Sequence, residues 1–225
     1  MTKQEVSARI EDIGIIPAIR LASLEEARFA AESIYRAGLP IAEITMTVPG
    51  ALDLISSLLH DFPDMVVGAG TVLDAETARR AVEAGARFIT STGMDATVVG
   101  LAVERGVLVL PGALTPTEII NAWKAGADFV KVFPCAPLGG DSYIRALKVA
   151  LPQIRLIAGG GVQQHTAGHY IAAGASAIGV GKELITHEAI HLRKAEWILE
   201  LAHRFMGIVK NARAATRAAH VVTFK

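Results

Sequence analysis

Short apolar runs recur along the chain at a nearly regular interval, with segments of helical periodicity between them. Eight runs begin roughly 19 to 26 residues apart, the length of one strand, one helix and two loops. Most runs are apolar at successive positions, which is typical of parallel strands buried on both faces. Strands are therefore predicted at residues 15–20, 41–45, 65–70, 88–91, 107–110, 129–133, 155–158 and 177–180.

The intervening segments carry helical patterns and end on residues that stop a helix. Five of them end on a glycine placed where a helix C-terminus needs a left-handed residue: Gly38, Gly85, Gly106, Gly126 and Gly174. Helices are predicted at residues 24–37, 51–59, 75–84, 96–105, 116–125 and 143–151. The segment before residue 15 is predicted to form an extra helix, and the segment after residue 188 a long final helix with a short tail.

Eight consecutive strand–helix units predict an α/β fold of the (β/α)8 TIM-barrel type, with an extra N-terminal helix. An open, doubly wound sheet is the alternative, although such sheets rarely need eight even units. No linker divides the sequence, so residues 1–225 are predicted to form a single domain. In a barrel, the active site forms at the C-terminal ends of the strands.

The composition argues against some kinds of binding partner. The chain holds 22 basic and 22 acidic residues and is 52% hydrophobic, and neither charge sign forms a block. A nucleic-acid or membrane-surface partner usually needs a clustered basic face, so neither is expected. Cys135 is the only cysteine, which excludes an intramolecular disulfide and a cysteine-rich zinc site. No signal-peptide core or membrane-spanning run is evident, and we expect a cytoplasmic protein.

Two charged residues of opposite sign stand inside predicted strands. Glu43 lies within "IAEIT" and Lys131 within "FVKVFP". Period-two alternation allows both side chains to face the barrel interior, where they would meet. A buried structural ion pair is one interpretation, but such a pair contributes little net stability. A lysine amine in a water-poor pocket can instead attack a ketone to form a Schiff base, and a nearby carboxylate can shuttle protons.

Other strand ends offer groups that bind anions. Arg20 closes the first predicted strand and could hold a substrate carboxylate with two hydrogen bonds, or it could be a solvated rim charge. Loops after the seventh and eighth strands of barrels often bind phosphate. Gly160, Gly161 and Gly181 lie in those loops and would let the backbone approach an anion closely, although simple tight turns would also explain them.

These stretches together resemble one family, the 2-keto-3-deoxy-6-phosphogluconate (KDPG) and 4-hydroxy-2-oxoglutarate (KHG) aldolases. The matching segments appear in order between about residues 15 and 185: "PAIR", "AEIT", "VGAGTVLD", "LPGALTPTE", "GADFVKVFP", "YIRALKVALP", "AGGGV" and "IGVGKEL". The resemblance implies a homotrimeric class I aldolase without metal or cofactor. It implies that Lys131 forms the Schiff base and Glu43 is the general acid/base. It also implies that Arg20 and Thr71 lie near the substrate carboxylate.

The resemblance further implies that Gly160, Gly161 and Gly181 lie near a substrate phosphate. Two positions depart from the gluconate-type pattern. Thr47 stands where those enzymes have an arginine, so the "EITMTVP" segment is more similar to the phosphogalactonate branch. Lys182 replaces a serine after the last loop glycine, and its ammonium could bind phosphate or carboxylate directly.

One motif in the sequence would indicate a different function, that of a zinc protease. The segment from His187 to His191 reads H-E-x-x-H, as in zinc proteases, but no third ligand follows at a zincin spacing.

From the residues and the resemblance together, we predict a metal-independent aldolase that cleaves a 2-keto-3-deoxy-6-phospho sugar acid, or 4-hydroxy-2-oxoglutarate, to pyruvate and an aldehyde. The aldehyde would be glyceraldehyde 3-phosphate or glyoxylate. Another phosphate-binding barrel enzyme, such as an epimerase or isomerase, and a non-catalytic phosphosugar-binding barrel are the alternatives.

Overall fold

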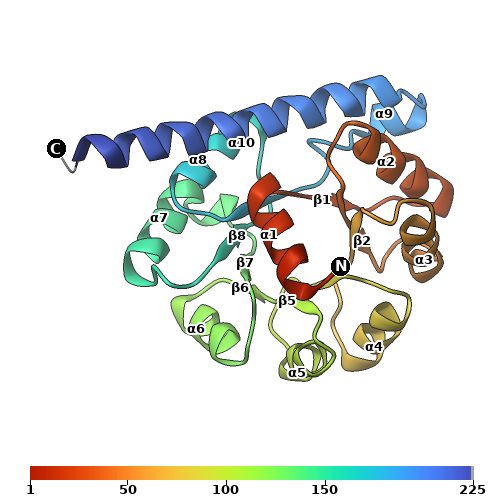
Figure 1. The fold of residues 1–225 in the computed structure, drawn as a ribbon, viewed down its shortest axis with the longest axis horizontal. Helices are drawn as coiled ribbons and strands as arrows, with labels where there is room; N and C mark the ends of the chain where they lie inside the picture. Colours follow the sequence, from red (N-terminus) through yellow and green to blue (C-terminus); the bar gives the residue numbers. More distant parts are fainter. Residues whose placement is uncertain (224–225) are drawn as a thin grey trace.

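The computed structural model describes residues 1–223 and shows parallel strands curved into a barrel with helices around it (Figure 1). The sheet order is β5-β4-β3-β2-β1-β9-β8-β7-β6. The two ends of this order, β5 and β6, are separated in sequence only by Pro111, so the sheet returns to its own starting segment and confirms the predicted barrel. The strands are β1 (Ile15–Ile19), β2 (Ile41–Thr45), β3 (Val66–Gly70), β4 (Phe88–Thr90), β5 (Leu108–Leu110), β6 (Gly112–Ala113), β7 (Val130–Val132), β8 (Leu156–Ala158) and β9 (Ala177–Val180).

Each barrel strand except β5, which leads directly into β6, is followed by helical structure on the outside of the sheet (Figure 1). The six helices predicted between strands are all present, with ends within three residues of those expected. They are α2 (Leu24–Arg36), α3 (Ala51–Asp61), α4 (Ala75–Glu83), α5 (Ala96–Glu104), α6 (Pro116–Lys124) and α7 (Gly140–Ala150). A short 3-10 turn, η1 (Ala136–Leu138), precedes α7, and α8 (Gln164–Ala172) connects β8 to β9.

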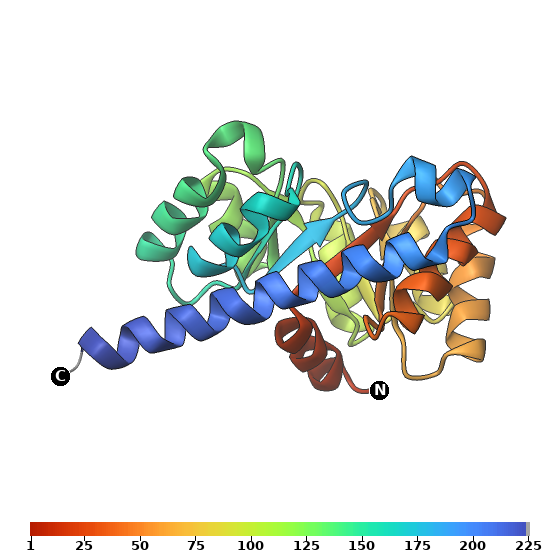
Figure 2. The same cartoon turned by 90° about the horizontal axis from the view of Figure 1, so that it is seen from above.

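The two ends of the chain add helices to the barrel. The predicted N-terminal helix is α1 (Lys3–Ile13), which covers the barrel at the end opposite the strand tips (Figure 2). The C-terminal segment differs from the single long helix that we predicted. It forms a short helix α9 (His187–His191), a turn in which Arg193 has a φ of 51°, and then the long helix α10 (Ala195–Thr223). The predicted tail falls partly on residues 224–225, outside the described residues.

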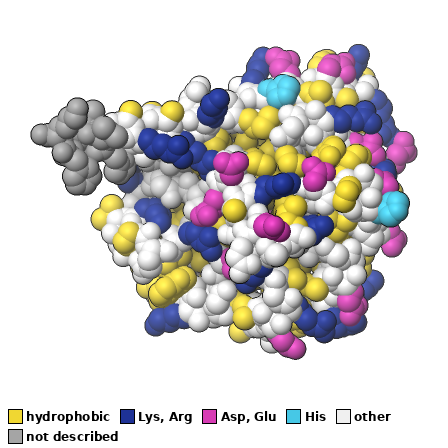
Figure 3. All heavy atoms as spheres, in the orientation of Figure 1, with side chains coloured by type: hydrophobic (Ala, Val, Ile, Leu, Met, Phe, Trp, Pro, Cys, Tyr) yellow, Lys and Arg dark blue, Asp and Glu magenta, His cyan; other side chains and the backbone are white. Residues whose placement is uncertain are grey.

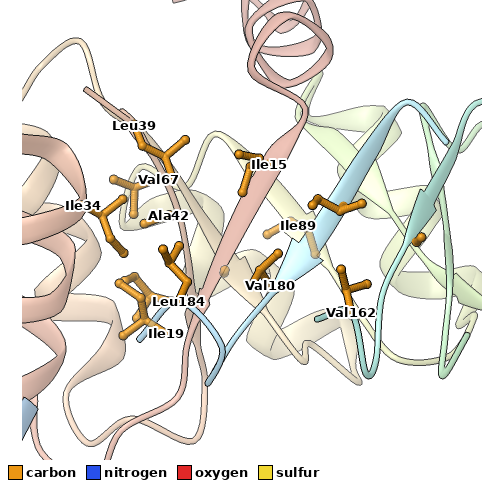
Figure 4. Packing of buried hydrophobic residues seen from close by; sticks show 14 of the residues in the cluster. Ile15, Ile19, Ile34, Leu39, Ala42, Val67, Ile89, Val162, Val180 and Leu184 are labelled. Carbon is orange, nitrogen blue, oxygen red and sulfur yellow. The ribbon is translucent and has the colours of Figure 1, made fainter. Parts of the chain in front are cut away.

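Two apolar layers hold the barrel together. Inside it, Phe88, Phe129 and Ile157 pack with Val6 and Ile10 of α1, so α1 closes the floor of the lumen. Outside it, the larger layer lies between the strands and the surrounding helices (Figure 4). The lumen above the inner layer therefore holds the side chains that point inward near the strand tips, among them both buried charges, Glu43 and Lys131.

Charges of both signs are dispersed over the surface that carries α1 (Figure 3). This pattern agrees with equal numbers of acidic and basic residues along the chain. Among the described residues, no helix is long and apolar enough to cross a membrane.

Candidate functional site

The two charged residues predicted inside strands meet in the barrel lumen. Lys131 is the middle residue of β7 and is 8% exposed, and Glu43 is the middle residue of β2 and is 3% exposed. The Lys131 Nζ lies 3.2 Å from the Glu43 Oε2. The strands that carry them lie on opposite sides of the barrel, so the lumen side chains rather than the backbone ladder bring them together.

The lumen makes room for Glu43 by omitting a side chain at Gly70. A Cβ atom at Gly70 would lie 2.1 Å from the Glu43 Oε1, a separation that no real contact tolerates. Gly70 ends β3, directly beside β2, and its partner across the ladder is Thr45. Gly70, the second glycine of "VGAGT", is therefore required by the position of the carboxylate and not by an unusual backbone angle.

A second side chain also contacts the lysine. Thr90, the last residue of β4, is 1% exposed, and its Oγ1 lies 3.4 Å from the Lys131 Nζ. Thr90 was not predicted as a site residue from the sequence. The alternation of side chains along a strand could have identified it. Phe88 faces the lumen, so Thr90, two positions later, faces it as well.

The predicted carboxylate-binding residues lie together at the rim. The Arg20 Nη2 donates a hydrogen bond to the Thr71 Oγ1 at 3.1 Å. Thr71 follows β3 with a φ of 54°, a left-handed conformation that is uncommon for threonine. Arg20 lines the central cleft. Thr71 contacts the arginine and does not line the cleft itself. Arg20 is exposed, so its guanidinium can reach a ligand in the cleft.

The predicted phosphate-binding residues line the same cleft from the far side. Gly160 and Gly161 follow β8 with φ values of 81° and 89°, and a Cβ at Gly160 would lie 2.8 Å from the Pro134 Cα. The left-handed backbone and this close packing require glycine there, and both glycines line the cleft. Gly181 and the exposed Lys182 follow β9 and line it too.

The cleft has a volume of about 410 Å³, which suits a small metabolite. Of the predicted site residues, all except Thr71 line it directly: Arg20, Glu43, Lys131, Gly160, Gly161, Gly181 and Lys182. Thr92, Gln163 and Glu183 also line it and were not predicted as site residues. A short cleft with a buried amine–carboxylate pair at its base and cationic side chains at its rim is suited to an acidic carbonyl compound.

A second cavity of about 440 Å³ lies beside α1 and α10, at the opposite end of the barrel. Its main cation, Arg213, donates hydrogen bonds to the backbone carbonyls of Glu11, Asp12 and Ser176. Those bonds tie α10 to the end of α1 and engage the guanidinium. We therefore assign this cavity no part in the chemistry of the cleft.

The H-E-x-x-H segment forms α9, away from the central cleft. The His187 and His191 rings stack with centroids 6.1 Å apart, and neither residue lines the cleft. Among the described residues, no three histidine, cysteine, aspartate or glutamate side chains gather closely enough to hold a metal ion. The motif is thus a pair of exposed histidines on a short helix.

Cys135 is buried below the glycine turn that follows β8. Its Sγ lies 3.7 Å from the Gly160 carbonyl oxygen, and burial raises the pKa of the thiol. The thiol therefore stays protonated at neutral pH. Cys135 packs as a small residue in the layer between the strands and the helices.

The fold and the cleft define a class: a (β/α)8-barrel lyase whose buried lysine is paired with a carboxylate, as in class I aldolases. The family comparison gives the same class. A model of the aldolase family described as KDPG and KHG aldolase matches residues 6–201, and the chain belongs to this family. It is a class I aldolase, a carbon–carbon lyase.

Individual relatives agree with this assignment. The chain is 32% identical to a 2-dehydro-3-deoxy-phosphogluconate aldolase of Treponema pallidum, over 72% of this chain and 78% of the relative. It is also 32% identical to a probable 2-dehydro-3-deoxy-6-phosphogalactonate aldolase of Rhizobium meliloti, over 76% and 81%. A solved structure of KDPG aldolase from Legionella pneumophila, with pyruvate captured as a covalent carbinolamine, is 27% identical with a TM-score of 0.82 and coverage of 90% and 97%.

Proposed function

We propose that Lys131 is the Schiff-base residue and that Glu43 is the general acid/base of a retro-aldol reaction. The contact of 3.2 Å between their side chains in the buried lumen carries this proposal. The Nζ attacks the C2 ketone of a 2-keto-4-hydroxy acid, and loss of water leaves a cationic imine that withdraws electrons. Glu43 takes the proton from the C4 hydroxyl, the C3–C4 bond breaks, and the electron pair forms an enamine. Protonation at C3 and hydrolysis release pyruvate and free the lysine.

Arg20 and Thr71 are proposed to hold the substrate carboxylate. Their mutual hydrogen bond supports this proposal, since Arg20 lines the same cleft as Lys131. Thr47 supports this assignment, because its hydroxyl lies 2.8 Å from the Thr45 hydroxyl and the residue does not line the cleft. The cation for the carboxylate then comes from Arg20, directly after β1, as in the phosphogalactonate branch that the sequence resembles.

The far end of the substrate is proposed to carry a phosphate. The backbone N–H groups around Gly160, Gly161 and Gly181 would surround it, and Lys182 would add a positive charge. The substrate would then be a 2-keto-3-deoxy-6-phospho sugar acid, and the aldehyde product glyceraldehyde 3-phosphate. 4-Hydroxy-2-oxoglutarate, which would yield glyoxylate, is the shorter candidate. Steady-state kinetics with the phosphogluconate-derived, phosphogalactonate-derived and hydroxy-oxoglutarate substrates would rank them.

The assembly and the location are proposed on the family resemblance and on the composition of the chain. We propose a homotrimer in the cytoplasm that takes its small keto acid substrate from solution and has no nucleic-acid or membrane partner. The dispersed surface charges support the last point. The single buried cysteine fits a reducing compartment.

Reduction with borohydride in the presence of pyruvate tests the proposed chemistry directly. Borohydride reduces an imine to a stable amine, so the peptide that contains Lys131 should gain the mass of a reduced pyruvate adduct. The K131A variant should gain none and should lose retro-aldol activity. A protein that cleaves the keto acids without forming an adduct on Lys131 would contradict the assignment, and turnover of phosphosugars without bond cleavage would favour an isomerase or epimerase.

A further inference from the structure

Thr90 is a buried hydroxyl that faces the reacting nitrogen. Its side chain shares the lumen with Phe88 below it, and its backbone carbonyl accepts a hydrogen bond from the Val72 N–H at 3.1 Å. That bond and the pairing with Leu110 of β5 hold the end of β4 in place. The contact at 3.4 Å therefore joins a fixed hydroxyl to a flexible lysine side chain.

The surroundings of the Nζ explain what such a hydroxyl can do. Glu43 lies 3.2 Å from the nitrogen, and a Cβ at Gly159 would lie 3.1 Å from the Lys131 Cε. Gly159 thus leaves space beside the lysine without offering a polar side chain. Among the described residues, Glu43 and Thr90 are the side chains within hydrogen-bonding distance of the nitrogen.

The number of hydrogens on the nitrogen falls during the reaction. The neutral amine has two N–H bonds and a lone pair; attack on C2 uses the lone pair, and loss of water leaves an iminium nitrogen with one N–H. If the Glu43 carboxylate accepted the hydrogen bond from this remaining N–H, the carboxylate would be engaged at the step in which it must take the proton of the C4 hydroxyl. A neutral acceptor on another side of the nitrogen removes this conflict.

We propose that Thr90 is a positioning residue for Lys131, whose hydroxyl orients the amine for attack and then accepts the iminium N–H, so that Glu43 is free to move protons. This inference rests on the proposed role of Lys131. Thr90 touches the nitrogen and exchanges no proton with the substrate. Its contribution is to hold one geometry through several steps, as a hydrogen bond to a charged group can.

Two substitutions of Thr90 separate this role from simple packing. T90V keeps the shape and loses the hydroxyl, whereas T90S keeps the hydroxyl and loses the methyl group. If Thr90 only fills the lumen, T90V should be the milder change. If it positions the nitrogen, T90S should be the milder change, because a lost hydrogen bond to a charged group costs about tenfold or more in rate.

The measurements are the rate of borohydride trapping with saturating pyruvate, and kcat and KM for retro-aldol cleavage. Both the trapping rate and kcat should be at least about tenfold higher in T90S than in T90V, with KM changing less than about threefold. A smaller ratio in either rate overturns the proposal. If T90V does not fold, as judged by thermal melting, T90A replaces it under the same criterion.

The controls isolate this inference from the proposed function. S33A removes another buried hydroxyl, which on α2 bonds the Phe29 carbonyl away from the cleft, and it should leave the trapping rate unchanged. Wild-type protein that forms no adduct with pyruvate would sink the Schiff-base assignment itself. Wild-type protein that forms the adduct, together with similar rates in T90V and T90S, would sink only the role of Thr90.

Discussion

At the scale of one residue, Glu43 raises the question of why the barrel contains a buried charge. A buried ion pair gives little net stability because desolvation offsets the attraction between the charges. The chain nevertheless holds this carboxylate at 3% exposure and gives up a side chain at Gly70 to do so. The arrangement fits the proton transfer proposed for Glu43 better than a role in stability.

Replacing Glu43 by glutamine should remove proton transfer while keeping the shape of the side chain. We expect kcat for retro-aldol cleavage to fall by about 10²- to 10⁴-fold in E43Q, the usual contribution of a general acid/base. Steady-state kinetics would measure this, with E104Q on the exposed face of α5 as a control of unchanged activity. An E43Q variant within a factor of about three of wild type would rule out the assigned role.

Adding one methyl group at Gly70 should displace the carboxylate. In G70A the new Cβ would meet the Glu43 Oε1, so the glutamate must move away from Lys131. We expect a large loss of kcat together with a stability loss of about 1–3 kcal/mol from overpacking. The control is G100A on α5, where no heavy atom lies within 4 Å of the added Cβ. Wild-type kcat in a folded G70A would show that the position of Glu43 does not matter.

Helix caps determine where the elements around the cleft begin. Asp95 precedes α5 and accepts hydrogen bonds from the Thr97 and Val98 N–H groups at 2.9 and 3.0 Å. Hydrogen bonds from the Thr97 side chain and then from backbone N–H groups lower the pKa of the Asp95 carboxyl. The ionised cap therefore contributes more to the stability of the folded chain than the protonated one.

This cap should make part of the stability depend on pH. Because the pKa is lower in the folded state, the contribution is complete above the ordinary aspartate pKa of about 3.9 and is lost as the pH falls through the lowered value. The urea midpoints of wild type and D95A should therefore differ most near pH 7 and converge towards pH 3. A constant difference across this range would mean that ionisation of Asp95 does not contribute. D53A on α3, whose cap residue Gly50 makes no side-chain hydrogen bond, is the matched comparison.

At the scale of the whole molecule, the proposed trimer can be tested by mass. The chain has a mass of 23.7 kDa, and light scattering after size-exclusion chromatography should give three times that value. Apolar side chains exposed on the isolated chain, such as Leu73 at 62% and Val149 at 81%, are candidates for burial in a contact. A mass equal to one chain over a range of concentrations would contradict the trimer.

Local pattern predicted much of this molecule. The eight strands and six helices between them were placed within a few residues, because strand and helix periodicity and the glycine stops are encoded in neighbouring residues. No bounds were predicted for α8, the helix between β8 and β9. The departures occurred where distant contacts decide the outcome. Strand 107–110 continues beyond Pro111 as β6, because the Pro111 carbonyl accepts the Lys131 N–H at 2.9 Å. The final helix is divided after His191 by a turn that local pattern did not reveal.

By itself, the sequence determined the fold class, the order of the elements and which charged residues lie inside strands, since each depends on residues close together along the chain. Only the tertiary structure decided that Glu43 and Lys131 lie 3.2 Å apart, that Gly70 leaves the space for this, and that Thr90 is the second side chain within hydrogen-bonding distance of the nitrogen. Those relations join β2, β3, β4 and β7 across the lumen. They depend on how far the barrel curves and which way each strand is turned, which no local stretch of residues encodes.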